Sequence, residues 1–413
     1  MINRFIALLL FFSVGATAQI NTSSPYSFFG IGTTQFKGTI ESRSMGGLSI
    51  YSDSIRVNLQ NPAGLSRFKL VNFSVAGSYN YVDLQSENRS SIASTTAINY
   101  IALGIPLTEK LGVSFGLLPY TSVGYGLTSI SGQTIIYNSG EGGTNKVFLG
   151  AGYQVMPELS VGLEAAYNFG KIENTTIFNQ DDIQYGTKEL NQSALSGFSF
   201  NLGVAYKKMI SEKLELQSGA TFGLESKLNS ENFRQLSSVL VLNENIYAEI
   251  DIMEVDVDDT KLTMPTQYSF GLGIGEPRKW FAGAEYFSQQ KNNYINRTFT
   301  LANVEAKNAS TVKLGGFYIP DYRSISSYWN RVTYRAGVRY ENTGLILNQE
   351  DINEFGISFG VGLPLGRLFS NINLGVEVGQ RGTTNAGLVK ENFFNTFISL
   401  SLNDRWFVKT LYD

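Results

Sequence analysis

Apolar and polar residues alternate along most of this chain, with the period of two residues that is typical of β-strands. Val71, Phe73 and Val75 share one face of such a strand, whereas Asn72 and Ser74 share the other. Comparable segments begin at Leu159, Phe198 and Val332. Each predicted strand therefore has one apolar face and one polar face.

Fourteen antiparallel strands are predicted from this alternation and from the turns between them. They cover residues 68–85, 95–107, 111–127, 144–155, 159–171, 196–208, 214–229, 263–275, 280–290, 308–319, 331–346, 354–365, 371–383 and 391–406. An even number of strands lets one chain close into a transmembrane barrel with both of its ends on the same side. The alternative is a soluble sandwich of two sheets, in which the aromatic faces would form the core.

Two features favour the barrel over the sandwich. The polar faces carry charged side chains that would line a wet lumen. These lumen charges are Glu164, Lys207, Glu285, Arg335, Arg339 and Glu377. In addition, short turns alternate with long connections, as periplasmic turns alternate with external loops in outer-membrane barrels. The long connections are predicted at residues 128–143, 171–196, 229–262 and 290–309, and the connection 320–330 is the one predicted to be both long and periplasmic.

The composition agrees with a membrane barrel and excludes several classes of protein. Only 16% of the residues are charged, against about 25% in soluble domains. The chain contains no Cys and no His, which excludes thiol chemistry, Ser-His catalysis and the usual zinc sites. We therefore expect no enzyme, no metal site and no cofactor. The net charge of −3 gives no indication of a nucleic-acid partner.

The first residues have the pattern of a secretory signal peptide. Arg4 is followed by an apolar run and then by Ala16-Thr17-Ala18, which places small residues where a signal peptidase reads them. We predict cleavage near Ala18 and export to the outer membrane. The predicted organisation is a signal peptide over residues 1–18, an N-terminal plug over 19–67, a barrel over 68–406 and a C-terminal tail over 407–413.

The predicted plug contains two short motifs that resemble a known family. Residues 44–49 read Ser-Met-Gly-Gly-Leu-Ser, and residues 58–65 read Asn-Leu-Gln-Asn-Pro-Ala-Gly-Leu just before the first strand. This arrangement resembles the hatch of the FadL family of outer-membrane transporters for hydrophobic compounds, here of a type found in Bacteroidota. The resemblance implies a 14-stranded barrel with an N-terminal hatch. It also implies that Asn61, Pro62 and Ala63 act as a latch, and a plain structural turn is the alternative for the same residues.

Pro119 lies in the middle of the third predicted strand, where it cannot donate a hydrogen bond to the ladder. The wall is therefore expected to bulge or kink there. In the FadL family a kink in the third strand makes a side opening, so the resemblance implies a lateral opening at Leu117, Leu118, Pro119 and Tyr120. A local bulge without a passage is the alternative.

The first functional hypothesis is passive uptake of small hydrophobic molecules, which would leave sideways near the third strand. Its partners would be outer-membrane lipid and a hydrophobic small-molecule ligand or detergent. The second hypothesis is a non-transporting FadL-like subunit of an outer-membrane protein secretion or assembly complex, whose partners would be other outer-membrane proteins. The acidic segment 247–259 and the connection 320–330 would then be docking surfaces.

Overall fold

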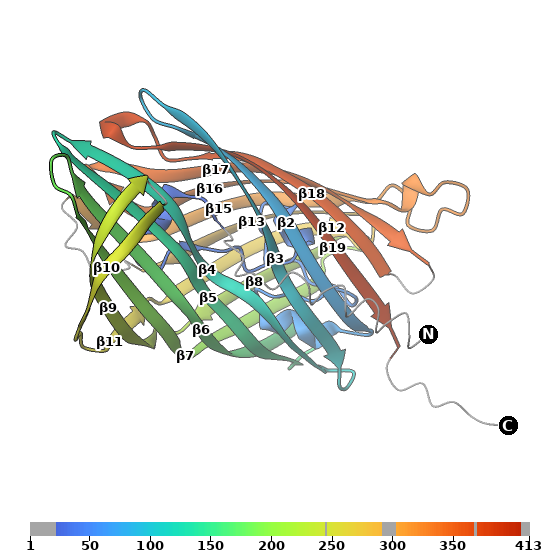
Figure 1. Cartoon of the computed structure of the whole chain (residues 1–413). Coiled ribbons are helices and arrows are strands. Elements are labelled where there is room, and N and C mark those ends of the chain that lie inside the picture. Colours follow the sequence, from blue (N-terminus) through green and yellow to red (C-terminus); the bar gives the residue numbers. More distant parts are fainter. Residues whose placement is uncertain (1–21, 244–245, 291–302, 367–369, 406–413) are drawn as a thin grey trace, which may run out of the picture.

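Fourteen wall strands form one closed antiparallel barrel in the computed structural model, which describes residues 22–243, 246–290, 303–366 and 370–405 (Figure 1). Several wall strands are interrupted: β8 and β9 form one strand, β10, β11 and β12 another, and β14 and β15 a third. β19 pairs with β2 and closes the wall. The elements of the wall are β2 (Val71–Gln85), β3 (Ser90–Pro106), β4 (Leu111–Ser131), β5 (Thr134–Gln154), β6 (Leu159–Gln180), β7 (Gly186–Met209), β8 (Glu215–Gly223), β9 (Ser226–Asn243), β10 (Ile246–Val255), β11 (Thr260–Met264), β12 (Gln267–Glu276), β13 (Trp280–Gln289), β14 (Val304–Ala306), β15 (Ala309–Tyr318), β16 (Thr333–Leu347), β17 (Glu350–Leu365), β18 (Ser370–Arg381) and β19 (Lys390–Asp404).

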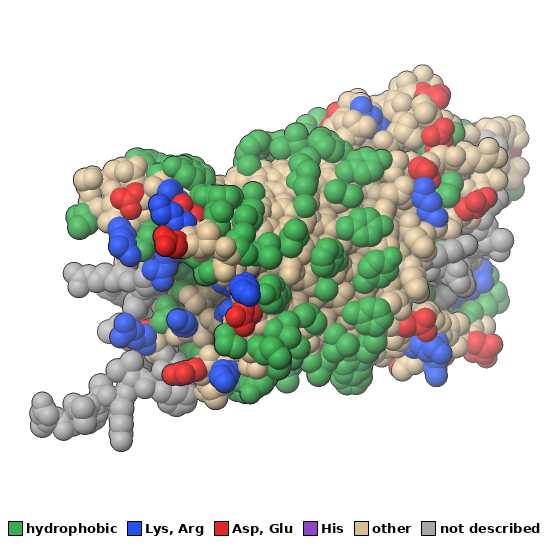
Figure 2. Space-filling model, turned by 180° about the vertical axis from the view of Figure 1, so that it is seen from behind, with side chains coloured by type: hydrophobic (Ala, Val, Ile, Leu, Met, Phe, Trp, Pro, Cys, Tyr) green, Lys and Arg blue, Asp and Glu red, His purple; other side chains and the backbone are tan. Residues whose placement is uncertain are grey.

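The two faces of the wall are as the alternation predicts. In β16, Tyr334 is exposed on the outside, whereas Thr333 and Arg335 are buried toward the lumen. Figure 2 shows apolar side chains in a broad band over the outer wall, with charged side chains concentrated toward the two ends of the barrel. Because lipid contacts only the outer face, one apolar face per strand is sufficient for a wall of this kind.

The strands are longer than predicted. Most of the residues that were predicted to form long loops therefore belong to strands. Residues 128–143 and 171–196 are mostly the extended hairpins β4–β5 and β6–β7, and β9–β10 takes up much of 229–262. The wall strands therefore continue well past the ends that apolar alternation gave them. Part of the predicted loop 290–309 falls outside the described residues, as do the predicted signal peptide and the tail 407–413. The connection 320–330 is long, and it contains the short helix η4 (Trp329–Arg331).

The N-terminal segment lies inside the barrel and forms a plug (Figure 1). Its elements are η2 (Pro25–Phe28), β1 (Thr33–Thr34), α2 (Ile40–Arg43) and η3 (Pro62–Arg67). Ile40 and Leu65 of the plug share an apolar cluster with Tyr100 and Phe148 of the wall, and all four are nearly inaccessible to solvent. The core of the molecule is thus the contact between the plug and the inner wall. In the part of the chain that the structure describes, no helix is long and apolar enough to cross a membrane.

The orientation of the barrel can be tested with single cysteines, because the native chain has none. Gln133 and Asp182 occupy hairpin ends at one end of the barrel, whereas Glu109 and Lys213 occupy turns at the other end, where β2 begins and β19 ends; all four are exposed. We expect a membrane-impermeant maleimide to label Gln133→Cys and Asp182→Cys on intact cells. Glu109→Cys and Lys213→Cys should react only after permeabilisation. The reverse pattern would mean that the barrel is inserted the other way round.

Candidate functional site

A groove of glycines in the barrel wall receives the helix η3 of the plug. Gly112, Gly152, Gly162 and Gly203 lie on four adjacent strands and pair with one another in register. A side chain at Gly162 would overlap the backbone nitrogen of Ala63, and one at Gly112 would overlap the carbonyl oxygen of Leu65. The absence of side chains therefore lets the plug backbone lie directly on the wall.

The predicted latch residues lie in this glycine groove. Asn61 is buried and caps η3 by accepting a hydrogen bond from the Ala63 nitrogen at 3.0 Å. Its amide also donates to the carbonyl of Val204 in β7, at 3.0 Å. Pro62 occupies the first helical position, where its missing N–H is not needed. The motif is thus both a helix cap and a link to the wall; whether it acts as a latch remains a prediction.

A second glycine groove lies in another part of the wall and receives the turn that follows α2. Gly315 and Gly337 pair in register across β15 and β16, and side chains there would overlap the backbone of Met45 and Gly46. Gly46 and Gly47 have φ values of +70° and +87°, in the left-handed region that favours glycine. The two plug motifs singled out in the sequence therefore each fit a separate groove.

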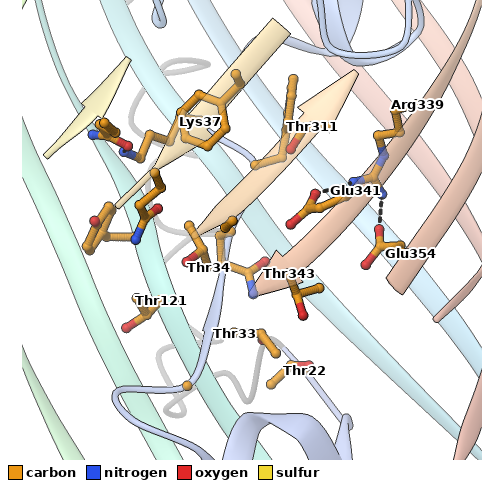
Figure 3. A pocket seen from close by; sticks show the side chains of 18 of the residues that line it. Thr22, Thr33, Thr34, Lys37, Thr121, Thr311, Arg339, Glu341, Thr343 and Glu354 are labelled. Carbon is orange, nitrogen blue, oxygen red and sulfur yellow. Dashed lines mark hydrogen bonds and ion pairs between the residues drawn. The ribbon is translucent and has the colours of Figure 1, made fainter. Parts of the chain in front are cut away.

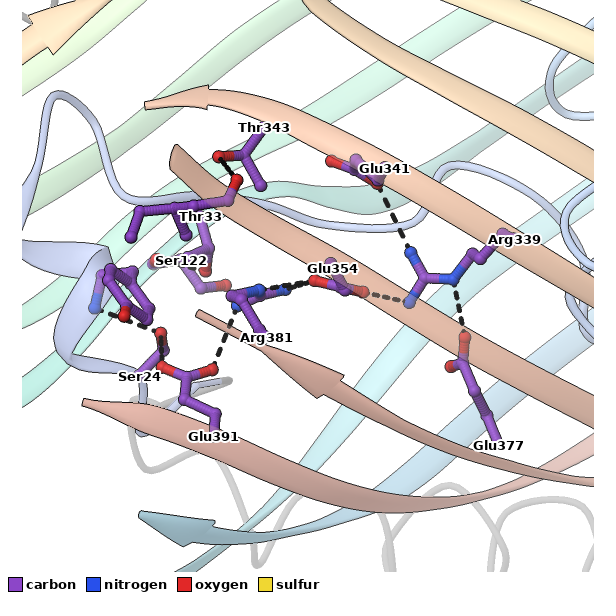
Figure 4. A network of polar contacts seen from close by, with 12 residues as sticks. Ser24, Thr33, Ser122, Arg339, Glu341, Thr343, Glu354, Glu377, Arg381 and Glu391 are labelled. Atoms are coloured by element: carbon purple, nitrogen blue, oxygen red, sulfur yellow. Dashed lines mark hydrogen bonds and ion pairs between the residues drawn. The ribbon is translucent and has the colours of Figure 1, made fainter. Parts of the chain in front are cut away.

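A chain of buried ion pairs joins the plug to β16, β17, β18 and β19 (Figure 4). Arg43 of the plug pairs with Glu377 at 2.8 Å, and Arg339 pairs with the same carboxylate at 2.8 Å. Arg339 also pairs with Glu354, which in turn pairs with Arg381. Arginine is suited to such sites because its planar guanidinium bonds two carboxylates at once.

This chain of ion pairs ends at a second contact with the plug. Arg381 pairs with Glu391 at 3.4 Å, and the hydroxyl of Ser24 donates a hydrogen bond to the Glu391 carboxylate. The plug is therefore bonded to both ends of this series of ion pairs, through Arg43 at one end and through Ser24 at the other.

The other predicted lumen charges also find partners on the inner wall. Glu164 pairs with Lys146, and Lys207 pairs with Glu215 at 2.8 Å. These two pairs link neighbouring wall strands. They do not involve the plug.

Two more of the predicted charges are connected to the plug, Glu285 directly and Arg335 through Asn373. Glu285 pairs with Lys313 at 2.8 Å and accepts hydrogen bonds from the nitrogen and hydroxyl of Ser49. Arg335 donates to Asn373 at 3.1 Å, and Asn373 donates to Glu41 of the plug at 2.9 Å. Five of the six predicted lumen charges thus pair with an opposite charge, whereas Arg335 reaches the plug through Asn373.

β4 separates from its neighbour β3 close to Pro119. The β4–β5 register shifts between Pro119 and Thr121, which is a β-bulge. β3 pairs with β4 only as far as Leu117, and among the described residues β4 has no pairing with β3 beyond that point. Leu118, Pro119 and Tyr120 are buried, whereas Leu117 is exposed. The predicted bulge is present; the lateral opening remains a prediction.

The plug takes the place of β3 along this part of β4. β1 pairs antiparallel with β4, with Thr33 opposite Ser122 and Thr34 opposite Thr121. The nitrogen of Gln35 donates to the carbonyl of Tyr120 at 2.9 Å. Backbone groups that would otherwise be unmet at membrane depth are thereby satisfied by the plug.

A cavity of about 390 Å³ lies between the plug and the wall. Threonines and charged side chains from both surround it (Figure 3). Lys37 of the plug donates to Gln267 at 3.3 Å and lies 4.8 Å from the centre of the Tyr120 ring. Among the described residues, no cluster of three or more acidic side chains could hold a metal ion.

Sequence reasoning identified only some of the residues that form the buried ion pairs. Arg43, Lys146, Lys313, Glu354 and Arg381 were not predicted as site residues, although four of them lie on the polar phase of a predicted strand or of its extension. That phase is the signal that could have found them. Arg43 lies in the plug, which has no periodicity, so nothing in the pattern distinguishes it.

The packing of η3 in the first glycine groove can be tested by adding a single methyl group at Gly162. Gly162→Ala should displace η3, because the new Cβ would occupy the space of the Ala63 nitrogen; overpacking of this kind costs about 1–3 kcal/mol. We expect faster proteolysis of residues 22–67 and an intact barrel that remains heat-modifiable on gels. The matched control is Gly126→Ala, whose Cβ would meet no atom within 4 Å. Equal digestion of both variants would contradict the packing described here.

Comparison with known proteins supports the fold and assigns the family. The Pseudomonas putida toluene transporter TodX is similar in structure, with a TM-score of 0.60 and 15% identity over 91% of this chain and 100% of that one. A Pseudomonas aeruginosa FadL homologue matches with a TM-score of 0.58 and 11% identity over 90% and 98% of the two chains. At such identities the likeness shows the fold alone, and none of the curated proteins matches by sequence. The model of the BamG family matches residues 1–413, and the chain therefore belongs to the BamG family.

Proposed function

We propose that this chain is a non-transporting FadL-like barrel that serves as a subunit of an outer-membrane assembly complex. The observation that carries the proposal is the plug, which is fixed to the wall on several sides. The two glycine grooves, the Arg43–Glu377 pair and the β1–β4 pairing act in different parts of the lumen. A part held in this way is suited to a permanent structural role.

The energetics of the lumen support the same proposal. Withdrawing Arg43 from Glu377 would leave a buried carboxylate that keeps only Arg339 as its partner. Breaking a buried pair by removing one partner costs about 3–5 kcal/mol. Opening the plug would also break the β1–β4 pairing. The cost of repeated opening is therefore high for a passive channel, which has no energy source to offset it.

The outer surface of the barrel gives further support to the proposal. The hairpin extensions expose apolar side chains, among them Ile130, Ile183 and Ile252. Exposed apolar groups of this kind are suited to contact with another protein. The name of the BamG family suggests an assembly-complex role.

The proposal is tested by purification of the tagged full chain from native outer membranes in a mild detergent. We expect a defined set of partner proteins in constant stoichiometry through size-exclusion chromatography, because a subunit is held by a specific interface. An unrelated outer-membrane barrel with the same tag is the control. Recovery of this chain alone, under conditions that keep a known membrane complex intact, would rule the proposal out.

A second candidate function, uptake of hydrophobic molecules, is favoured by one observation. β4 separates from β3 after Leu117, next to a bulge at Pro119. The FadL-like fold makes this separation a candidate side opening, and the solved TodX structures are those of a toluene transporter and a monoaromatic hydrocarbon channel. We also propose that the chain comes from a bacterium of the Bacteroidota.

Pro119→Val discriminates between these two functions. Valine would supply the missing donor and favour a regular β4–β5 ladder. If the separation carries substrate, uptake of a hydrophobic fluorescent probe by whole cells should fall several-fold. We expect no change in uptake, because the plug already covers this edge of β4. Pro364→Val, in β17 and away from the separation, is the matched control. A fall confined to Pro119→Val would favour transport.

A further inference from the structure

The connection between β15 and β16 differs from the other turns at its end of the barrel. It covers residues 319–332, whereas the turns near Glu109, Pro157 and Arg278 contain only a few residues. In Figure 1 it extends outward at the end of the wall where β2 begins and β19 ends. Short turns suffice to join antiparallel strands, so the extra length is not required by the barrel.

This 319–332 loop is folded on itself. The nitrogen of Asp321 donates to the carbonyl of Asn330 at 2.8 Å, and the nitrogen of Ser324 donates to the carbonyl of Asp321 at 3.2 Å. The hydroxyl of Tyr334 donates to the carbonyl of Trp329 at 3.3 Å. A loop that is ordered before binding loses less conformational entropy when it binds.

The 319–332 loop exposes large apolar side chains. Ile325 is 101% exposed and Trp329 is 65% exposed. Tyr328 packs edge-on against Trp329, with ring centres 6.0 Å apart. Tryptophan and tyrosine are enriched among the residues that dominate binding energy at protein interfaces, and here they have no role in the core of the barrel.

Three exposed arginines surround these aromatic rings. Arg278 and Arg323 lie over the ring of Tyr322, at 5.4 and 5.2 Å, and Arg331 lies over the ring of Tyr328 at 5.4 Å. In the described part of the chain none of the three forms an ion pair with a carboxylate. The arginines of the lumen ion pairs are each bonded to at least one glutamate. The guanidiniums of the loop are thus positioned but not neutralised.

We propose that the 319–332 loop, together with Arg278, is a docking surface for an acidic segment of a periplasmic partner protein. Its guanidiniums, which have no carboxylate partner among the described residues, match carboxylates in charge and in bidentate geometry. Its exposed aromatic side chains provide the apolar centre of the contact. The inference rests on the proposed function in one respect, namely that the chain has a protein partner. Anionic lipid headgroups would be attracted by the same charges, and the experiment separates the two.

A photo-reactive benzoylphenylalanine at Ile325 of the full chain, irradiated in native outer membranes, tests the proposal. We expect a cross-linked protein whose modified peptide, identified by mass spectrometry, has an excess of Asp and Glu. The same probe at Ile183, which is exposed at the opposite end of the barrel, should not give this product. Arg323→Glu with Arg331→Glu should reduce the yield by about tenfold or more, because like charges in contact oppose binding. Arg323→Lys with Arg331→Lys keeps the charge but loses the bidentate geometry, so the yield should fall less than it does after charge reversal.

Several outcomes would overturn the assignment of the loop. These are cross-links to lipid alone, a partner peptide without acidic excess, a yield that is insensitive to charge reversal, or no cross-link at all. Retained heat-modifiable mobility of the charge-reversal variant serves as the folding control. If that variant still copurifies with the full partner set, the loop assignment fails and the proposed function stands. If the native chain has no partner set, the proposed function fails as well.

Discussion

Close contact between the plug backbone and the barrel wall is the feature on which the rest of the structure depends. It is possible only because glycines on neighbouring strands lie in register, as Gly162 and Gly203 do beneath η3, and Gly315 and Gly337 do beneath Gly46. A single β-carbon at such a position would separate the two backbones. The sequences of the wall and of the plug are therefore matched to each other. Each glycine groove is explained by the plug segment that lies in it, which is η3 in one case and the turn after α2 in the other.

Packing at this distance buries many charged side chains of the lumen and so determines how these charges are arranged. A carboxylate such as Glu377 is tolerated there because Arg43 and Arg339 both contact it. Buried pairs of this kind are often no more stabilising than apolar residues of the same size, but they penalise any arrangement that separates them. Arg43 thus contributes chiefly by fixing the place of the plug, because moving it away would leave Glu377 with Arg339 as its only partner.

Alternation along the sequence was sufficient to predict the strands, the closed barrel and the faces of residues such as Tyr334 and Arg335. The alternation did not predict the hairpin extensions, where the wall strands no longer require one apolar face. In the hairpin extensions, Lys188 and Asn191 are buried polar groups on β7, and the period of two is lost there although the ladder continues. The pairing register of the strands was a second feature that the sequence did not predict. Gly162 and Gly203 are partners across two strands, and no local pattern indicates which glycines meet.

The separation at Pro119 shows how one fold detail is compatible with two functions. A proline in a closed wall leaves a backbone acceptor without its donor, and the strand must turn away from lipid. Here the exposed edge of β4 is covered by the plug itself: Gln35 donates to Tyr120, and the hydroxyl of Ser27 accepts from Gly124 at 3.0 Å. Uptake through this edge would require β1 to leave β4 and then to return, against the Ser24–Glu391 hydrogen bond and the Arg43–Glu377 ion pair that hold the segments before and after it. A structural subunit requires no such movement. The same hydrogen bonds that make the bulge tolerable in a membrane therefore favour a plug that stays in place.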